Sequence, residues 1–74
     1  MALKTNTELL RALIQEHTAL FDKMRKLDVT LKDPENRLIV GSEQWGLLSI
    51  QLKVMETYAE VLFQRIQLIE QEEK

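Results

Sequence analysis

A chain of 74 residues, with 45% hydrophobic and 30% charged residues, has the composition of a single folded domain or a coiled coil. Because cysteine is absent and histidine occurs once, disulfides, histidine clusters and thiolate metal sites are excluded, and we predict no metal and no cofactor. The net charge of -2 argues against binding to duplex nucleic acid, and no segment has the hydropathy of a membrane span, so we expect a soluble cytoplasmic protein.

The first predicted element is a helix over about residues 6–32. Thr5-Asn6-Thr7-Glu8 fits a capping box, in which a threonine hydroxyl and a glutamate satisfy free backbone N–H groups at the helix start. Apolar side chains then follow a seven-residue repeat, which is typical of helices that pack in bundles. The repeat consists of Leu10, Leu13, His17, Leu20, Met24, Leu27 and Leu31.

Residues 33–41 are predicted to form a loop, because Pro34 disfavours a helical conformation at Asp33 and Gly41 ends the connection. A second helix over about residues 43–70 follows. Two long helices with a short connection predict an all-α fold, an antiparallel two-helix hairpin, with residues 1–74 as one domain. The first apolar seam of the second helix contains Trp45, Leu48, Leu52, Met55, Ala59, Leu62, Ile66 and Ile69.

The second helix carries a second apolar seam beside the first, made of Leu47, Val54, Val61 and Leu68. One partner helix cannot cover both seams, so we predict that the hairpin self-associates into a helical bundle, as a dimer or a larger homo-oligomer. Phe63 and Trp45 complete the predicted interface residues. For Trp45 the favoured interpretation is a plug that closes the open end of the hairpin against the loop residues Leu38, Ile39 and Val40.

Gln51, Tyr58 and Arg65 repeat every seven residues and form a polar column along the edge of the second seam. As structural residues, they fit the rim of an oligomer interface, where long side chains contribute contact area and keep a hydrated polar tip. As binding residues, they fit a phosphorylated or cyclic nucleotide, with arginine on the phosphate and tyrosine stacked on the base. Both roles stay open at this point.

His17 is the polar member of the repeat in the first helix. The favoured interpretation is a hydrogen-bonded core histidine that fixes the helix register, and the alternative is a ligand-binding or pH-sensitive residue. No catalytic residue is predicted, because Ser42 and Thr7 fit helix caps and no histidine and acid stand at a spacing that completes a nucleophilic site. We therefore do not expect an enzyme.

The segment over residues 47–69 resembles the second helix of a family of very small helical hairpins encoded by crAss-like phages and prophages. The matching residues are Leu47, Leu48, Gln51, Leu52, Lys53, Met55, Tyr58, Leu62, Arg65 and Ile66. The resemblance implies an accessory protein in the cytoplasm of an infected bacterial host. By analogy with other compact phage proteins, it implies an oligomer that sequesters an immune signal of the cyclic nucleotide or ADP-ribose type.

The predicted ligand-binding set is therefore the polar column together with His17 and Lys53. The alternative function is a protein-interaction module that inhibits a host defence protein or serves in a structural assembly. That module would use Phe63, Ile50 and the apolar residues of the predicted loop as anchors.

Overall fold

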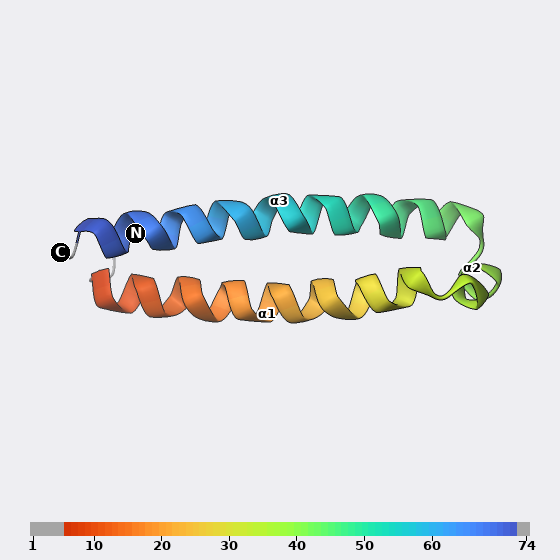
Figure 1. Cartoon of the computed structure of the whole chain (residues 1–74), viewed down its shortest axis with the longest axis horizontal. Helices are drawn as coiled ribbons and strands as arrows, with labels where there is room; N and C mark the ends of the chain where they lie inside the picture. The colour runs from red at the N-terminus through yellow and green to blue at the C-terminus, as the bar shows by residue number, and fades with distance from the viewer. Residues whose placement is uncertain (1–5, 73–74) are drawn as a thin grey trace.

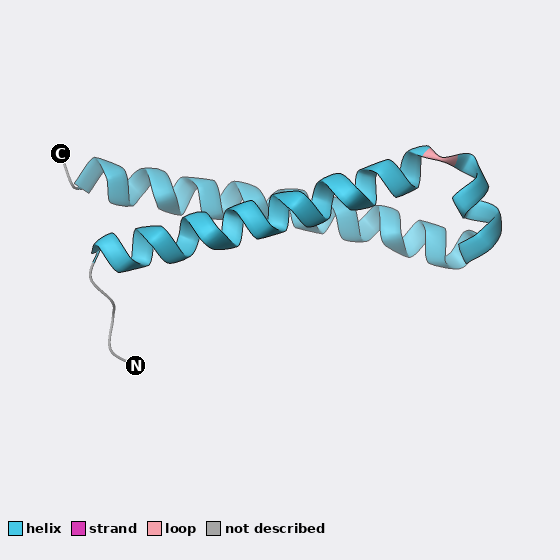
Figure 2. Ribbon diagram, turned by 90° about the horizontal axis from the view of Figure 1, so that it is seen from below, coloured by secondary structure: helices cyan, strands magenta, loops and turns pink. Residues whose placement is uncertain are grey.

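The computed structural model describes residues 6–72, which form three helices. Helix α1 spans Asn6–Lys32, α2 spans Pro34–Val40 and α3 spans Ser42–Glu72. The two long helices run antiparallel, so that α1 begins at the end of the molecule where α3 ends, while α2 caps the opposite end (Figure 1). They cross near their middle (Figure 2) in a molecule of 50 × 25 × 15 Å. The predicted all-α class is confirmed, whereas Thr5 of the predicted capping box lies outside the described residues.

The connection between the long helices differs from the prediction, because residues 34–40 form α2 instead of a loop. Asp33 adopts an extended conformation, and its side-chain oxygen accepts a hydrogen bond of 3.0 Å from the backbone N–H of Glu35. Aspartate is a favoured N-cap, and proline is tolerated in a first helical turn because its missing N–H would have no intrahelical partner there. The proline that ends α1 therefore begins α2.

Gly41 joins α2 to α3 without an intervening loop. Its N–H donates to the carbonyl of Arg37 at 2.9 Å, and its own carbonyl accepts from the N–H of Trp45 at 2.9 Å. The residue has φ 87° and ψ 155°, a backbone conformation that is essentially restricted to glycine. One glycine thus closes α2 and opens α3, and it makes the sharp change of direction at the end of the hairpin.

The core lies between α1 and α3 and is thin. Among residues 6–72 the buried side chains are Leu13 of α1 and Ala59, Leu62 and Ile69 of α3, of which Leu62 is completely inaccessible. The three residues from α3 all belong to the first seam, so this seam faces α1 as predicted. The half-buried residues that pack around this core are Leu9, Leu10, Leu20 and Ile66.

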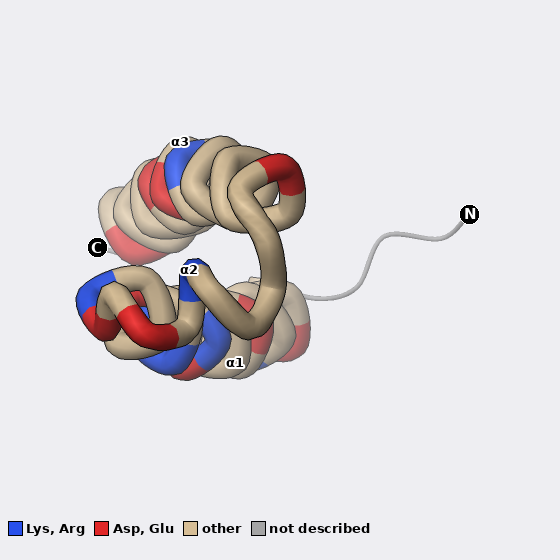
Figure 3. The backbone as a smooth tube through the Cα atoms, turned by 90° about the vertical axis from the view of Figure 1, so that its right-hand side faces the viewer, with Lys and Arg blue, Asp and Glu red and all other residues tan. Residues whose placement is uncertain are grey.

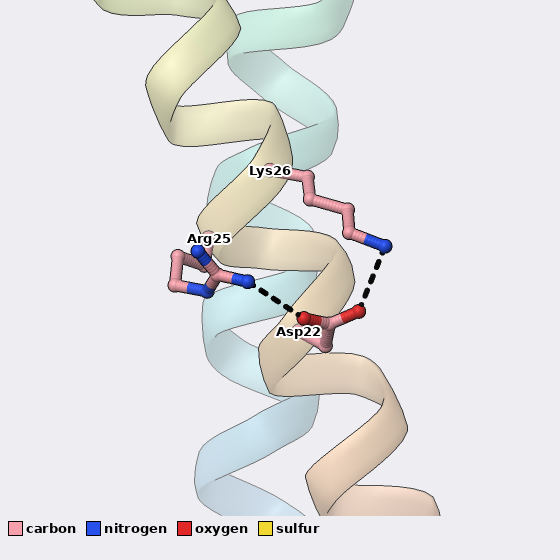
Figure 4. Close-up of polar contacts among 3 residues, drawn as sticks. All are labelled: Asp22, Arg25 and Lys26. Atoms are coloured by element: carbon pink, nitrogen blue, oxygen red, sulfur yellow. Dashed lines mark hydrogen bonds and ion pairs between the residues drawn. The ribbon is translucent and has the colours of Figure 1, made fainter.

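The outer face of α1 is charged and hydrated. Nine of the 27 residues of α1 are Asp, Glu, Lys or Arg, whereas α3 has seven such residues among 31. The end view in Figure 3 shows α3 as mostly uncharged. Asp22 pairs with Arg25 and Lys26 at 3.0 Å each (Figure 4). These hydrogen bonds, first from Lys26 and then from Arg25, hold the pKa of the Asp22 carboxyl below its ordinary value. Exposed pairs of this kind add little stability, but they leave this face of α1 well solvated.

Candidate functional site

The second seam lies on α3 outside the core. Leu47, Val54, Val61 and Leu68 keep 60%, 62%, 48% and 59% of their surface exposed. Within residues 6–72 no part of the chain covers them, even though they are apolar and regularly spaced. Isolated exposed apolar residues are normal, but a continuous row along one helix is typical of an interaction surface.

The polar column lies at the edge of α3 that borders α1 on the side of Glu16. Tyr58, in the middle of the column, is 44% exposed, and its hydroxyl donates a hydrogen bond to the Glu16 carboxylate. Gln51 and Arg65 are exposed, and neither has a hydrogen-bond or ion-pair partner in the described part of the chain. Because residues seven apart return to nearly the same side of a helix, the three side chains share one edge of α3.

His17 and Phe63 lie on the other side of the hairpin. The ring of His17 stacks on Phe21, with centroids 5.7 Å apart, and contacts Phe63 in a tilted arrangement at 6.4 Å. Phe63 follows Tyr58 by five residues, which turns its side chain about 140° around α3, past the buried Leu62. His17 makes no hydrogen bond within residues 6–72, so aromatic packing replaces the hydrogen bond predicted for it.

Lys53 is also separated from the polar column. It is exposed, it precedes Tyr58 by five residues, and its side chain is therefore about 140° away around α3. The structure thus brings together Gln51, Tyr58 and Arg65 of the predicted ligand-binding set, and it places His17 and Lys53 elsewhere. The seven-residue spacing in the sequence predicted that Gln51, Tyr58 and Arg65 share an edge. No such spacing relates His17 or Lys53 to these three residues.

Trp45 is half-buried at the start of the first seam, but of the three residues predicted to form a plug around it only Val40, at 36% exposed, is largely covered. Leu38 and Ile39 of α2 are 87% and 80% exposed, so they project from the end of the hairpin instead of packing on the tryptophan. We call these two residues the α2 tip. Formation of α2 accompanies the difference, because the helix holds these two side chains on its solvent-exposed side.

Two open grooves flank Phe21 on the side of the hairpin that carries His17. Each has a volume of about 310 Å³, and both are lined by Phe21 and Arg25. The sequence predicted neither groove, and the residues around Phe21 in the first groove come from both long helices. The other lining residues are Met24, Asp28, Leu52 and Glu56 in one groove, and His17, Thr18 and Asp22 in the other.

A protein-family model described as Sequestin matches residues 7–68, which is most of the chain. The chain belongs to the Sequestin family. The Sequestin match extends over α1, α2 and most of α3, whereas the resemblance found in the sequence covered residues 47–69 alone. The name Sequestin is that of a sequestering protein and fits the general kind of function expected from the sequence. No curated protein and no solved structure matches the chain.

Two further observations describe what residues 6–72 contain. They include no group of three or more histidine, aspartate or glutamate side chains arranged to hold a metal ion. None of their helices combines the length and the hydropathy that crossing a bilayer requires. The polar column beside the second seam is the candidate site of this Sequestin because it joins exposed, regularly spaced polar side chains to an uncovered apolar row.

Proposed function

We propose that this protein is a non-enzymatic phage accessory protein that binds and sequesters a nucleotide-type immune signal in the cytoplasm of the bacterial host. The polar column beside the uncovered second seam carries the proposal. The Arg65 guanidinium has no ion-pair partner among the described residues and offers a planar fork to a phosphate, while the ring of Tyr58 offers a surface on which a base stacks. The family name supports sequestration as the mode of action.

The grooves beside Phe21 are poorer candidates for a phosphorylated ligand. The first places the carboxylates of Asp28 and Glu56 beside Arg25, and in the second Asp22 already binds the Arg25 guanidinium at 3.0 Å. A phosphate entering either groove would meet negative charge and an arginine that is already paired. The Glu16 carboxylate also lies at the polar column, where it accepts the hydrogen bond of the Tyr58 hydroxyl. The Arg65 guanidinium, however, has no ion-pair partner among the described residues, so the edge of α3 that carries Arg65 is favoured over the grooves.

The proposal includes self-association through the second seam. A sequestering protein of 8.7 kDa with a thin core gains both stability and a larger binding surface when its exposed apolar row is covered by another chain. Light scattering across the micromolar range is expected to give a mass of at least two chains. A mass that stays at that of one chain would remove this part of the proposal.

Binding is tested by thermal unfolding against a panel of cyclic dinucleotides, cyclic trinucleotides and cyclic ADP-ribose isomers. A ligand at 100 times its Kd stabilises the folded protein by about 2.7 kcal/mol. For a domain of this size, that corresponds to an increase in Tm of roughly 10 °C or more. Arg65→Ala is expected to abolish the increase because it removes the phosphate-binding group.

The matched control is Arg37→Ala, which makes the same change in charge and side chain on α2, at the end of the hairpin opposite to the end of α3 near which Arg65 lies. Arg37 contributes its backbone carbonyl to the cap at Gly41, and alanine keeps that carbonyl. This variant is expected to keep the full ligand-induced increase in Tm. The proposed site would be contradicted if no member of the panel raised Tm, or if Arg65→Ala and Arg37→Ala lost the ligand-induced increase in Tm to the same extent.

A second candidate function is a protein-interaction module that inhibits a host defence protein or serves in a structural assembly. The α2 tip favours it, because two adjacent aliphatic side chains that are 80% or more exposed are an unusual feature at the end of a hairpin. Ile39→Glu should then abolish protection of phage during infection while Arg65→Ala retains it. The opposite pattern favours sequestration of a nucleotide.

A further inference from the structure

The second seam and the polar column of α3 have nearly the same midpoint. The seam extends from Leu47 to Leu68, and the column extends from Gln51 to Arg65 with Tyr58 at its centre. We propose that two copies of the chain pair antiparallel through their second seams, with a twofold axis beside Tyr58. In this dimer each Arg65 forms a phosphate site together with Gln51 of the partner subunit. The pairing stands by itself, and the phosphate site rests on the proposed function.

The form of the second seam indicates a second copy as its occupant. Side chains spaced seven residues apart on one helix fit between those of another helix with the same spacing, and this chain supplies such a helix. The row is about 32 Å long at 1.5 Å per residue. A stable interface buries about 800 Å² on each partner, which is roughly 13% of the 6038 Å² that one chain exposes. The exposed large apolar residues of α1 among the described residues are Ile14, Phe21 and Val29, a shorter row than the second seam of α3.

Charge decides between the two possible directions of pairing. In a parallel pair, each Arg65 would lie level with the same residue of the other copy, and the acidic residues Glu70 and Glu72 would gather at one end. In an antiparallel pair centred on Tyr58, the two Arg65 positions are about 21 Å apart along the helices, beyond the distance of about 8–10 Å over which salt screens charges. The opposed helix dipoles also favour this arrangement.

The symmetry of an antiparallel pair makes the site a shared one. A twofold axis perpendicular to two paired helices keeps their equivalent residues on the same side of the interface, so the two polar columns lie side by side and run in opposite directions. Arg65 and Gln51 stand seven residues on either side of Tyr58. Arg65 of one chain therefore lies within about one turn of the level of Gln51 of the partner subunit.

Each of the two sites would combine a guanidinium from one chain with an amide from the other. The guanidinium binds phosphate oxygens, the amide can donate to and accept from a ribose or a base edge, and the two Tyr58 rings lie between the sites. The expected stoichiometry is therefore one ligand per chain, and two per dimer. A single chain has only half of each site, so binding depends on dimer formation.

Cross-linking tests the pairing without any ligand, in a chain whose lack of cysteine provides a clean background. Leu47→Cys and Leu68→Cys are purified separately, mixed by refolding and treated with a short bis-maleimide. The antiparallel pair is expected to link Leu47→Cys chains to Leu68→Cys chains in the mixture, with little linkage in either variant alone. Thr57→Cys, near the twofold axis, should link to itself, and Gln15→Cys on α1 serves as the unlinked control. The proposal is overturned if Leu47→Cys chains link to one another and Leu68→Cys chains link to one another. It is also overturned if the mixture of the two variants gives no cross-linked product.

Mixing two binding variants tests whether the site is shared, with inorganic pyrophosphate as the probe and calorimetry as the measurement. Arg65→Ala and Gln51→Ala homodimers are each expected to bind pyrophosphate about tenfold or more weakly than the unmodified chain. In an equal mixture, half of the dimers contain one chain of each kind, and each of these has one intact site. The mixture should recover about a quarter of the original sites with full affinity.

The outcomes separate the two proposals. If both residues acted within one chain, the mixture would recover no site, which overturns the shared site but leaves nucleotide sequestration intact. If the unmodified chain fails to bind pyrophosphate, the phosphate site is overturned, and the proposed function is overturned with it when no member of the nucleotide panel raises Tm. The cross-linking result then still decides whether the antiparallel dimer exists.

Discussion

Leu62→Ala is expected to lower the free energy of unfolding by about 2–5 kcal/mol. Leu62 is completely buried and belongs to a core cluster whose other buried members, within residues 6–72, are Leu13 and Ile69. Shortening it leaves a cavity between two helices whose remaining contacts are few. A domain of this size has a total stability of about 4–11 kcal/mol, so the substitution removes a large share of it.

Leu38→Ala is the matched control, because it removes the same atoms from a leucine that is 87% exposed. Its effect is expected to stay within about 0.5 kcal/mol. Urea unfolding followed by circular dichroism measures both variants, at one protein concentration because self-association would couple stability to concentration. Similar losses in the two variants would show that the packing around Leu62 does not hold the hairpin together.

Gly41→Ala is expected to destabilise the protein by about 1–3 kcal/mol through backbone strain. Its φ of 87° and ψ of 155° place it in a conformation that a residue with a Cβ atom rarely adopts. An added Cβ would meet no atom within 4 Å, so steric crowding by other residues contributes nothing to the expected loss. Relief of the strain would change the direction in which α3 leaves α2.

Gly46→Ala serves as the control, because its expected effect on stability has the opposite sign to that of Gly41→Ala. Gly46 lies inside α3, and a Cβ atom there also meets nothing within 4 Å. Alanine in a helix interior is favoured over glycine by about 0.5–1 kcal/mol, so this variant should be more stable than the unmodified chain. Thermal unfolding of the two variants side by side would contradict the account if Gly41→Ala proved neutral or stabilising.

The sequence determined those features of this protein that depend on spacing along a single helix. The seven-residue repeat placed Ala59, Leu62 and Ile69 on the side of α3 that faces α1, and the structure buries all three. The same regularity placed Gln51, Tyr58 and Arg65 on one edge of α3. Both results follow from the 3.6 residues per turn of an α-helix, which holds before any tertiary contact forms. Asp33 and Pro34, which begin α2, are a local signal as well. The prediction took Pro34 only as the residue that ends the first helix, and therefore missed α2.

Only the tertiary structure decided how the two helices meet, and with it what surrounds each candidate residue. Tyr58 and Glu16 are separated by 42 residues in the chain, and their hydrogen bond depends on how α3 is rotated and shifted against α1. The same docking places His17 with Phe63, on the other side from the polar column, and leaves the second seam uncovered. Helix rotation and register are set by the packing of both partners at once, a property that the periodicity of neither helix contains.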